Sequence, residues 1–144
     1  FAESTFAKQI ALIEKGYQKP VVYVGNLKSL RTIADVRDAC DAYYKLVTIN
    51  PIPGEFYNIG GNYTCTVGEI LNKLISLSNN KNISIKVDKN RLRPIDADLQ
   101  IPDTTKFKKH TGWKPKISFN KTMIDLLNYW RNKVHTEGNI FLNR

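Results

Sequence analysis

Residues 83–99 read Ile-Ser-Ile-Lys-Val-Asp-Lys-Asn-Arg-Leu-Arg-Pro-Ile-Asp-Ala-Asp-Leu and join a strand pattern to a pair of arginines. Ile83, Ile85 and Val87 alternate with polar residues, which predicts a half-buried β-strand. Pro94 fixes its own φ and restricts the residue before it, so the arginine segment should be extended. A guanidinium pairs bidentately with phosphate oxygens. We therefore interpret the end of this strand as an anion site suited to a diphosphate.

The same spacing allows a second interpretation. Arg91 and Arg93 can be surface charges with Asp96 or Asp98 as partners, a common arrangement that contributes little to stability. The rest of the chain decides between the two.

Helical and strand patterns alternate on both sides of this stretch. The apolar spacing predicts helices over residues 4–15, 34–48 and 118–134, a short one from Asp103 to His110 that stops at Gly112, and strands over 21–24 and 56–59. Thr66 and Glu69 form a capping box, which predicts a further helix after Thr66. Few strands separated by helices fit the α/β fold class.

Each amphipathic helix carries an apolar stripe that we expect to be buried core. In the helix over 34–48 the stripe consists of Val36, Ala39, Cys40, Tyr43 and Val47. In the last helix it consists of Met123, Leu126, Leu127, Trp130 and Val134. We assign residues 1–134 to one portion of the protein and 135–144 to a tail.

Six blocks in one order resemble the carboxy-terminal part of extended short-chain dehydrogenase/reductase enzymes that act on GDP-sugars. The blocks are Thr-Phe-Ala-Lys-Gln-Ile from Thr5, Val-Gly-Asn-Leu-Lys-Ser-Leu-Arg from Val24, Asp-Val-Arg-Asp-Ala from Asp35, Tyr-Asn-Ile-Gly from Tyr57, Arg-Pro-Ile-Asp from Arg93 and Thr-Gly-Trp-Lys-Pro from Thr111. The resemblance implies the substrate-binding lobe of a Rossmann-type enzyme. No Gly-x-Gly-x-x-Gly turn occurs in the sequence, so we expect the cofactor-binding half to lie outside this chain.

The resemblance also implies candidate substrate-binding residues. A loop equivalent to Phe1, Ala2 and Thr5 contacts the nucleotide sugar in relatives, although the dehydratases have a lysine where this chain has Thr5. Arg31 matches an arginine that contacts the substrate nucleotide. A plainer interpretation pairs Arg31 with Asp35 one helical turn on.

The resemblance implies two further substrate-binding residues, both within residues 91–99. Arg93 matches an arginine that binds the diphosphate, and Asp96 stands where dehydratases have a glutamate that bonds the sugar or ribose. An aspartate at this position is closer to the reductases.

The activity implied by the resemblance belongs to the whole enzyme. We expect a GDP-mannose 4,6-dehydratase-like reaction, in which C4 is oxidised, water is lost across C5 and C6, and C6 is reduced. The alternative is a GDP-4-keto-6-deoxymannose reductase or another nucleotide-sugar epimerase or reductase. The cofactor is NADP or NAD, bound mainly outside this chain, and the relatives imply a homo-oligomer. We expect the 144-residue chain alone to have no turnover.

We place no catalytic residue on this chain. Tyr129 and Lys133 form the Tyr-x-x-x-Lys pattern of the superfamily, but the pattern falls after the blocks that normally follow the catalytic pair. We interpret it as ordinary helix surface.

Composition narrows the class of protein. The charge of +9 invites a rival from another class, a basic nucleic-acid-binding or interaction module, but the lysines are scattered rather than gathered in a stripe with aromatics. Cys40, Cys65, His110 and His135 lack the spacing of a metal site. No apolar run approaches the length of a membrane span. We therefore expect a cytoplasmic protein without a metal or membrane partner.

Overall fold

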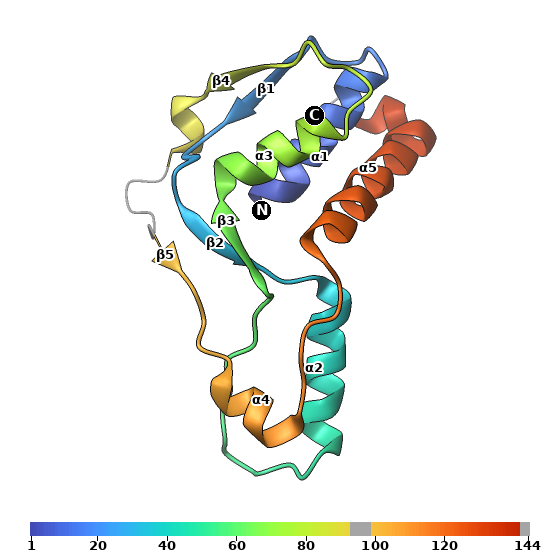
Figure 1. The fold of residues 1–144 in the computed structure, drawn as a ribbon. Helices are drawn as coiled ribbons and strands as arrows, with labels where there is room; N and C mark the ends of the chain where they lie inside the picture. Colours follow the sequence, from blue (N-terminus) through green and yellow to red (C-terminus); the bar gives the residue numbers. More distant parts are fainter. Residues whose placement is uncertain (93–98, 142–144) are drawn as a thin grey trace. The chain divides into compact units, whose positions relative to one another are not determined.

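The computed structural model describes residues 1–92 and 99–141, which divide into two compact units. The first unit is formed by Phe1–Ser29, Thr66–Asp98 and Met123–Arg144, and the second by Leu30–Cys65 and Leu99–Thr122, apart from the residues not described. Helices and strands alternate along the chain (Figure 1). The predicted α/β fold class is confirmed.

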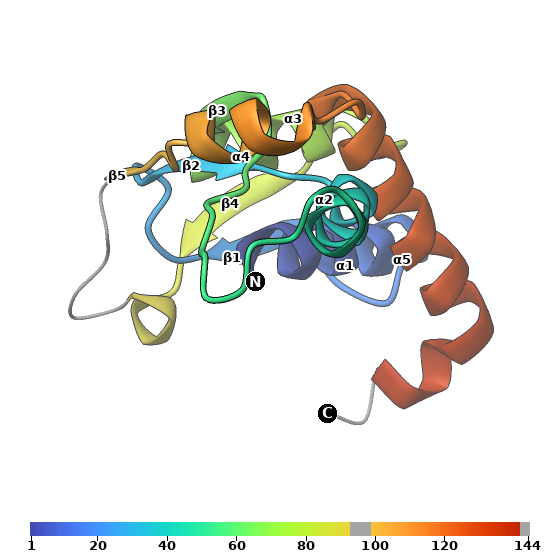
Figure 2. The same ribbon diagram turned by 90° about the horizontal axis from the view of Figure 1, so that it is seen from below.

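The first unit is built on a pair of parallel strands. β1 (Val21–Val24) pairs with β4 (Ser84–Val87) in the register Val21 to Ser84 through Val24 to Val87. The two strands lie side by side in Figure 1 and in the rotated view of Figure 2. The short helix η1 (Lys89–Arg91) follows β4.

Burial differs sharply between the two strands. Val22 and Val24 of β1 are fully buried, whereas Ile85 and Val87 of β4 are 43% and 57% exposed. The strand predicted at 83–87 is therefore present, but its predicted half-burial is wrong. Alternation identified which side chains share a face, and β4 is an outer strand whose apolar residues are not covered by the described residues.

The other edge of β1 is closed by a side chain. The Tyr23 N–H donates to Gln9 Oε1 over 2.8 Å, and Gln9 Nε2 donates to the Tyr23 carbonyl over 3.0 Å. The buried Gln9 thus provides the pair of hydrogen bonds that a neighbouring strand would supply.

The first unit also contains three helices, of which the first packs against β1 and the other two pack against the first. They are α1 (Ala2–Glu14), α3 (Val67–Ser76) and the part of α5 (Phe119–Phe141) from Met123 onward (Figure 1). The capping box of Thr66 and Glu69 is present as predicted. Met123, Leu127 and Val134 are buried as expected from the stripe, and the helix continues beyond the predicted end at 134.

A half-buried ion pair connects these helices. Arg131 Nε and Nη2 donate to the two carboxylate oxygens of Glu14 over 2.7 and 2.8 Å, and Nη2 also donates to the Leu77 carbonyl. Ser78 and the Asn79 N–H donate to the same carboxylate. Burial by itself raises the pKa of Glu14, but these hydrogen bonds outweigh it and hold the pKa below its ordinary value.

The second unit contains a three-stranded sheet in the order β3-β2-β5. Its strands are β2 (Leu30–Ile33), β3 (Tyr63–Thr66) and β5 (Leu99–Gln100), and its helices are α2 (Val36–Thr48) and α4 (Thr105–Thr111). The core gathers Ala42 of α2, Phe107 of α4 and Trp113, with Tyr57 and Ile59 packed against them.

Two carboxylates fix the start of α2. Asp35 caps the helix by accepting from the Arg37 N–H, and also accepts from the Thr122 hydroxyl over 2.8 Å. Asp38 is buried and accepts from the N–H groups of Lys116 and Ile117. The structure shows that Asp38 holds the segment before α5, and Asp35 the first turn of α5, against the start of α2.

The apolar stripe predicted for the helix over 34–48 is not core. Val36, Tyr43 and Val47 are 72%, 63% and 67% exposed, and Cys40 is exposed as well. Instead, the buried members of α2 are Asp38 and Ala42, which lie on the opposite side. We call the surface formed by Val36, Cys40, Tyr43, Tyr44 and Val47 the exposed α2 face.

The strand predicted over 56–59 is also not formed. Residues 55–62 have irregular backbone, and Phe56 is 82% exposed. Within the part of the chain that the structure describes, no strand lies beside this segment. α4 ends at Gly112, as predicted, and this glycine is in the left-handed conformation. Asp103 accepts from the Thr105 N–H at the helix start.

We predict that Gly61→Ala disrupts the second unit. A Cβ at Gly61 would lie 1.5 Å from the Ile33 carbonyl oxygen, so β2 or the segment that contains Gly61 must move. We expect a loss of about 3 kcal/mol of unfolding free energy, at the upper end for overpacking. Urea unfolding followed by Trp113 fluorescence in a Trp130→Phe background measures it. Gly68→Ala, where the nearest contact is 3.3 Å, is the matched control, and equal midpoints for the two variants would contradict the prediction.

We predict that the Glu14 carboxylate makes the stability of the chain pH-dependent. Because its pKa is lower in the folded state, its stabilisation is complete above the unfolded-state pKa of about 4.3 and disappears as the pH falls through the folded-state pKa. Glu14→Gln should lower the unfolding free energy at pH 7 by about 2 kcal/mol and flatten the acid limb. Circular dichroism melts from pH 3 to 7 test this, with Glu3→Gln as control. An acid limb as steep as that of the wild type would contradict the role of Glu14.

Candidate functional site

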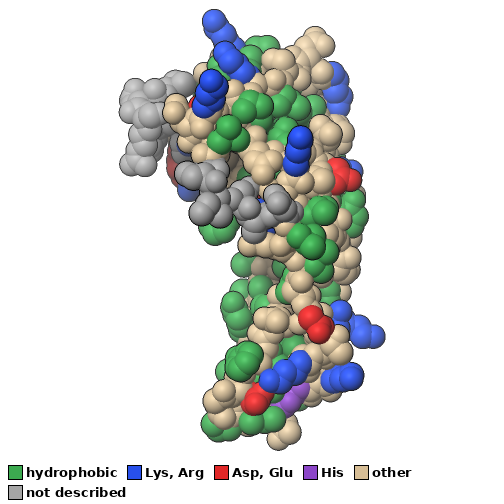
Figure 3. Space-filling view, turned by 90° about the vertical axis from the view of Figure 1, so that its left-hand side faces the viewer, with side chains coloured by type: hydrophobic (Ala, Val, Ile, Leu, Met, Phe, Trp, Pro, Cys, Tyr) green, Lys and Arg blue, Asp and Glu red, His purple; other side chains and the backbone are tan. Residues whose placement is uncertain are grey.

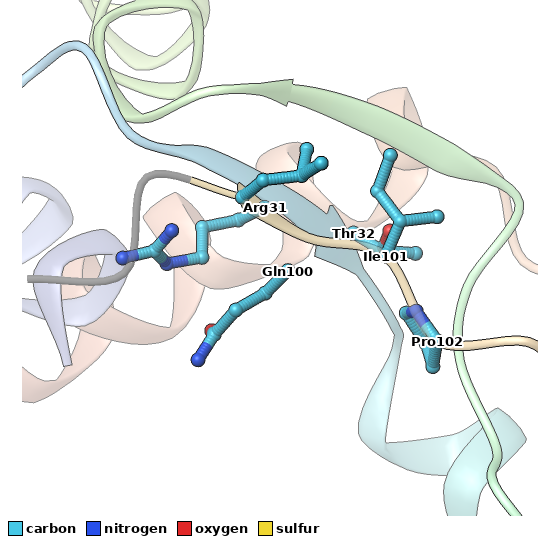
Figure 4. Close-up of a pocket in the computed structure, with 6 residues that line it drawn as sticks. Arg31, Thr32, Gln100, Ile101 and Pro102 are labelled. Atoms are coloured by element: carbon cyan, nitrogen blue, oxygen red, sulfur yellow. The ribbon is translucent and has the colours of Figure 1, made fainter.

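A pocket lies against the paired strands β2 and β5 of the second unit. Its volume is about 510 Å³, and Figure 4 shows its lining residues as sticks. They are Arg31, Thr32, Leu99, Gln100, Ile101 and Pro102. Of the predicted substrate-binding residues, Arg31 lines this pocket.

Strand pairing places the polar side chains of the pocket together. β2 and β5 are parallel, with Leu30 opposite Leu99 and Arg31 opposite Gln100. Opposed residues of neighbouring strands direct their side chains to the same side. Figure 4 shows the Arg31 guanidinium and the Gln100 carboxamide extending to one side of the strand pair. The pocket therefore combines a permanent cation with a neutral amide.

The Arg31 side chain is held by the backbone of its own strand. Nη1 donates to the Leu30 carbonyl over 2.8 Å, and the residue is half-buried. This hydrogen bond limits the positions of the guanidinium, so the side chain has already lost part of its conformational entropy in the unliganded protein. A partly fixed guanidinium binds an anion with less loss of entropy than a fully mobile one.

The alternative pairing of Arg31 with Asp35 one helical turn on is wrong. Arg31 lies in β2, whereas Asp35 is the N-cap of α2, so the spacing is not helical. The Asp35 carboxylate forms a bidentate pair with Arg37 at 2.8 Å for both contacts. The hydrogen bonds from Arg37, with that from Thr122, hold the pKa of Asp35 far below its usual range.

Phe1, Ala2 and Thr5 begin the helix α1 and do not form the expected loop. Phe1 is the N-cap and is fully exposed, and the Thr5 hydroxyl donates to the Phe1 carbonyl over 3.0 Å. Helical structure starts here because apolar residues recur on the buried side from Phe6 onward. These three residues belong to the first unit and Arg31 to the second, so the predicted set divides between two units.

Arg93 and Asp96 lie outside the described residues, so their roles stay predictions. Arg91 is described and exposed, and its Nε lies 3.3 Å from Asp88 Oδ2. Among the described residues, its partner is therefore three residues earlier in the chain, while Asp96 and Asp98 of the surface-pair interpretation lie outside them.

Tyr129 and Lys133 are part of the surface of α5. Tyr129 is exposed, the Lys133 ammonium lies 5.8 Å from the centre of its ring, and Lys133 also pairs with Glu137 at 3.8 Å. These contacts are ordinary for neighbouring turns of a helix and agree with the interpretation as helix surface.

Other classes of site find little support in the described residues. They contain no group of His, Cys, Asp and Glu side chains that could hold a metal ion. In Figure 3, the Lys and Arg side chains are scattered over the visible face between hydrophobic ones. Among the described helices, none is long and apolar enough to cross a membrane.

The sequence analysis missed Gln100 and the apolar residues around it. Nothing in residues 99–102 marks them as a site, because a lone glutamine among Leu99, Ile101 and Pro102 has no chemical signature. Only the register with β2 places Gln100 beside Arg31.

The family model described as GDP-mannose 4,6 dehydratase matches residues 1–126. The chain belongs to this family. It matches the carboxy-terminal part of the extended short-chain dehydrogenase/reductases, as the six sequence blocks predicted.

Individual relatives cover several activities. GDP-6-deoxy-D-mannose reductase of Pseudomonas aeruginosa is 26% identical over 137 residues, which are 95% of this chain and 44% of the relative. dTDP-D-glucose 4,6-dehydratase of Mus musculus is 26% identical over 143 residues, 96% of this chain and 39% of the relative. The family thus includes nucleotide-sugar dehydratases, reductases and epimerases.

The fold is shared with solved structures of these enzymes. RMD from Pseudomonas aeruginosa, complexed with NADPH, superposes with a TM-score of 0.84 and 25% identity over 93% of this chain and 43% of that one. The chain spans between a third and a half of the length of the curated relatives it matches.

Proposed function

We propose that the chain forms the nucleotide-sugar-binding part of an NAD(P)-dependent enzyme that acts on a GDP-sugar. The observation that carries the proposal is the Arg31 guanidinium in an open pocket of the second unit, at the position matched to a nucleotide-binding arginine. The pocket has the size of small-molecule sites and mixes a few polar groups with apolar walls.

Each group of the pocket has a physical role in this proposal. The guanidinium donates to the oxygens of the diphosphate, while Leu99, Ile101 and Pro102 exclude water from part of the ligand. Arg93 and Asp96 would add a second guanidinium and a hydroxyl acceptor. Holding the diphosphate fixes the hexose relative to a bound nicotinamide, which supplies the hydride chemistry. This chain binds and orients the substrate.

Reduction of a 4-keto sugar is the reaction we favour for the whole enzyme. The Pseudomonas aeruginosa reductase matches 95% of this chain, and the RMD structure shares its fold with a TM-score of 0.84. Asp96, in place of a glutamate, supports the same choice. In this reaction one hydride passes from the nicotinamide to C4 of the sugar and a proton reaches the C4 oxygen.

Dehydration of GDP-mannose is the second candidate. The family model carries that description, and a 4,6-dehydratase from Mus musculus matches 96% of the chain. The two activities are separated by the substrate consumed, since a dehydratase acts on GDP-mannose itself and a reductase only on the keto product.

We further propose that the exposed α2 face contacts the nicotinamide-binding part of the same enzyme. Two features of the second unit support this partner. Five apolar or aromatic side chains share the exposed α2 face, and the unit's predicted strand at 56–59 has no strand neighbour among the described residues. A sheet that adds a strand at 56–59 and packs on α2 would satisfy both. The relatives have more than half of their length beyond the matched part.

The proposed function predicts nucleotide binding that depends on Arg31. Calorimetric titration of the chain with GDP-mannose and GDP should show binding, and Arg31→Ala should weaken it about 10-fold, since a hydrogen-bonded charge is lost. Lys108→Ala removes an exposed charge from α4 of the same unit and should change the affinity less than 2-fold. Single-stranded DNA tests the rival class. Salt-sensitive DNA binding without any response to GDP compounds would refute the proposed function.

The exposed α2 face predicts a difference in solvent accessibility between the isolated chain and the full-length enzyme. Hydroxyl-radical labelling of Tyr43 and Tyr44 should be fast in the isolated chain and at least about 5-fold slower in the enzyme, because packing buries both rings. Tyr129, an exposed tyrosine on α5, is the internal control. Equal labelling in both proteins would refute the contact, and protection that rises with the concentration of the isolated chain would identify a second copy as the occupant instead.

A further inference from the structure

The Gln100 carboxamide faces the same pocket as Arg31. The two residues are opposite each other on parallel strands, and Figure 4 shows both side chains on one side of the pair. Gln100 is exposed, and within the described residues its carboxamide has no hydrogen-bond partner. A polar side chain aimed into a pocket beside a cation has donors and an acceptor available for a ligand.

The chemistry of the two groups is complementary. A guanidinium only donates hydrogen bonds, and a phosphate only accepts them, so Arg31 suits the phosphate. A carboxamide both donates and accepts. If phosphate were the sole partner of the carboxamide, the carboxamide oxygen would have no donor, because phosphate oxygens are also acceptors. A hydroxyl group, which also donates and accepts, can use both halves of the carboxamide.

We propose that Gln100 binds a hydroxyl group of the sugar that is esterified to the phosphate held by Arg31. The inference rests on the proposed function of the pocket. Opposed residues on neighbouring strands are about 4.8 Å apart, which matches the separation between a phosphate and a hydroxyl one or two carbons away on the same sugar. Gln100 thereby distinguishes a sugar phosphate from a bare diphosphate, a task that a second arginine could not perform.

Two sugars of a nucleotide sugar carry such hydroxyls, the ribose and the hexose. Four ligands separate them: GDP-mannose presents both, GDP only the ribose, mannose 1-phosphate only the hexose, and pyrophosphate neither. The response of Gln100 to this series identifies which sugar it contacts.

The first measurement is an NMR titration of the ¹⁵N-labelled 144-residue chain. The Gln100 side-chain NH₂ signals are assigned by their loss in Gln100→Leu, and the Arg31 Nε signal by its loss in Arg31→Lys. We expect both groups to shift with GDP-mannose, Gln100 to shift also with GDP or with mannose 1-phosphate, and only Arg31 to shift with pyrophosphate. NMR detects binding in the millimolar range, so weak affinity does not hide the result.

The second measurement is the affinity of variants. Gln100→Leu should bind GDP-mannose about 5-fold more weakly, the loss of one hydrogen bond, and pyrophosphate with unchanged affinity. Arg31→Ala should weaken both. Lys108→Ala, which removes an exposed charge of α4 outside the pocket, is the control and should change neither affinity by more than 2-fold.

The outcomes separate this inference from the proposed function. If Arg31 responds to GDP-mannose while Gln100 does not, the role of Gln100 is refuted and the nucleotide-sugar site stands. An equal response of Gln100 to pyrophosphate would also refute it, because the residue would then be a phosphate ligand. If neither group responds to any of the four compounds, the proposed function falls and this inference falls with it.

Discussion

The parallel pairing of β2 with β5 is the constraint on which the candidate site depends. Among the described residues, two pairs define it, Leu30 with Leu99 and Arg31 with Gln100. A shift of one residue would turn Gln100 to the opposite face of the strand pair and place an apolar side chain beside the guanidinium. The sheet order β3-β2-β5 puts β2 in the centre, so Arg31 is carried by the strand with two neighbours.

The elements that follow β2 restrict this central strand further. Asp35 and Asp38 bind the start of α2 to residues 116–122 through three hydrogen bonds, donated by the Lys116 and Ile117 N–H groups and the Thr122 hydroxyl. The Gly61 backbone approaches the Ile33 carbonyl so closely that no side chain fits. The residues that position β2, and with it Arg31, are therefore Asp35, Asp38 and Gly61. None of the three lines the pocket.

Local sequence signals predicted the positions of helices and strands well, but they predicted poorly which faces are buried and which strands pair. The capping box of Thr66, the helix end at Gly112 and the strand at 21–24 each depend on neighbouring residues, and each was found where predicted. The stripe on α2 was assigned to the core because periodicity identifies an apolar face without identifying what covers it. The segment 56–59 has the side chains of a strand, but a strand requires a neighbour, and none lies beside it in the described chain. Gln100 could be recognised only from the register of two strands far apart in sequence.

Charge acts at two ranges in this protein, and only the shorter one selects a ligand. The excess of 22 basic over 13 acidic residues surrounds the chain with a positive potential that attracts any anion, including a diphosphate or a nucleic acid. Such attraction raises the rate of encounter and weakens with salt, but it does not distinguish one anion from another. Discrimination requires groups held at fixed positions. In the second unit those groups are the Arg31 guanidinium, which is hydrogen-bonded to the Leu30 carbonyl, and the Gln100 carboxamide opposite it. The pocket can therefore bind both a phosphate and the group next to that phosphate.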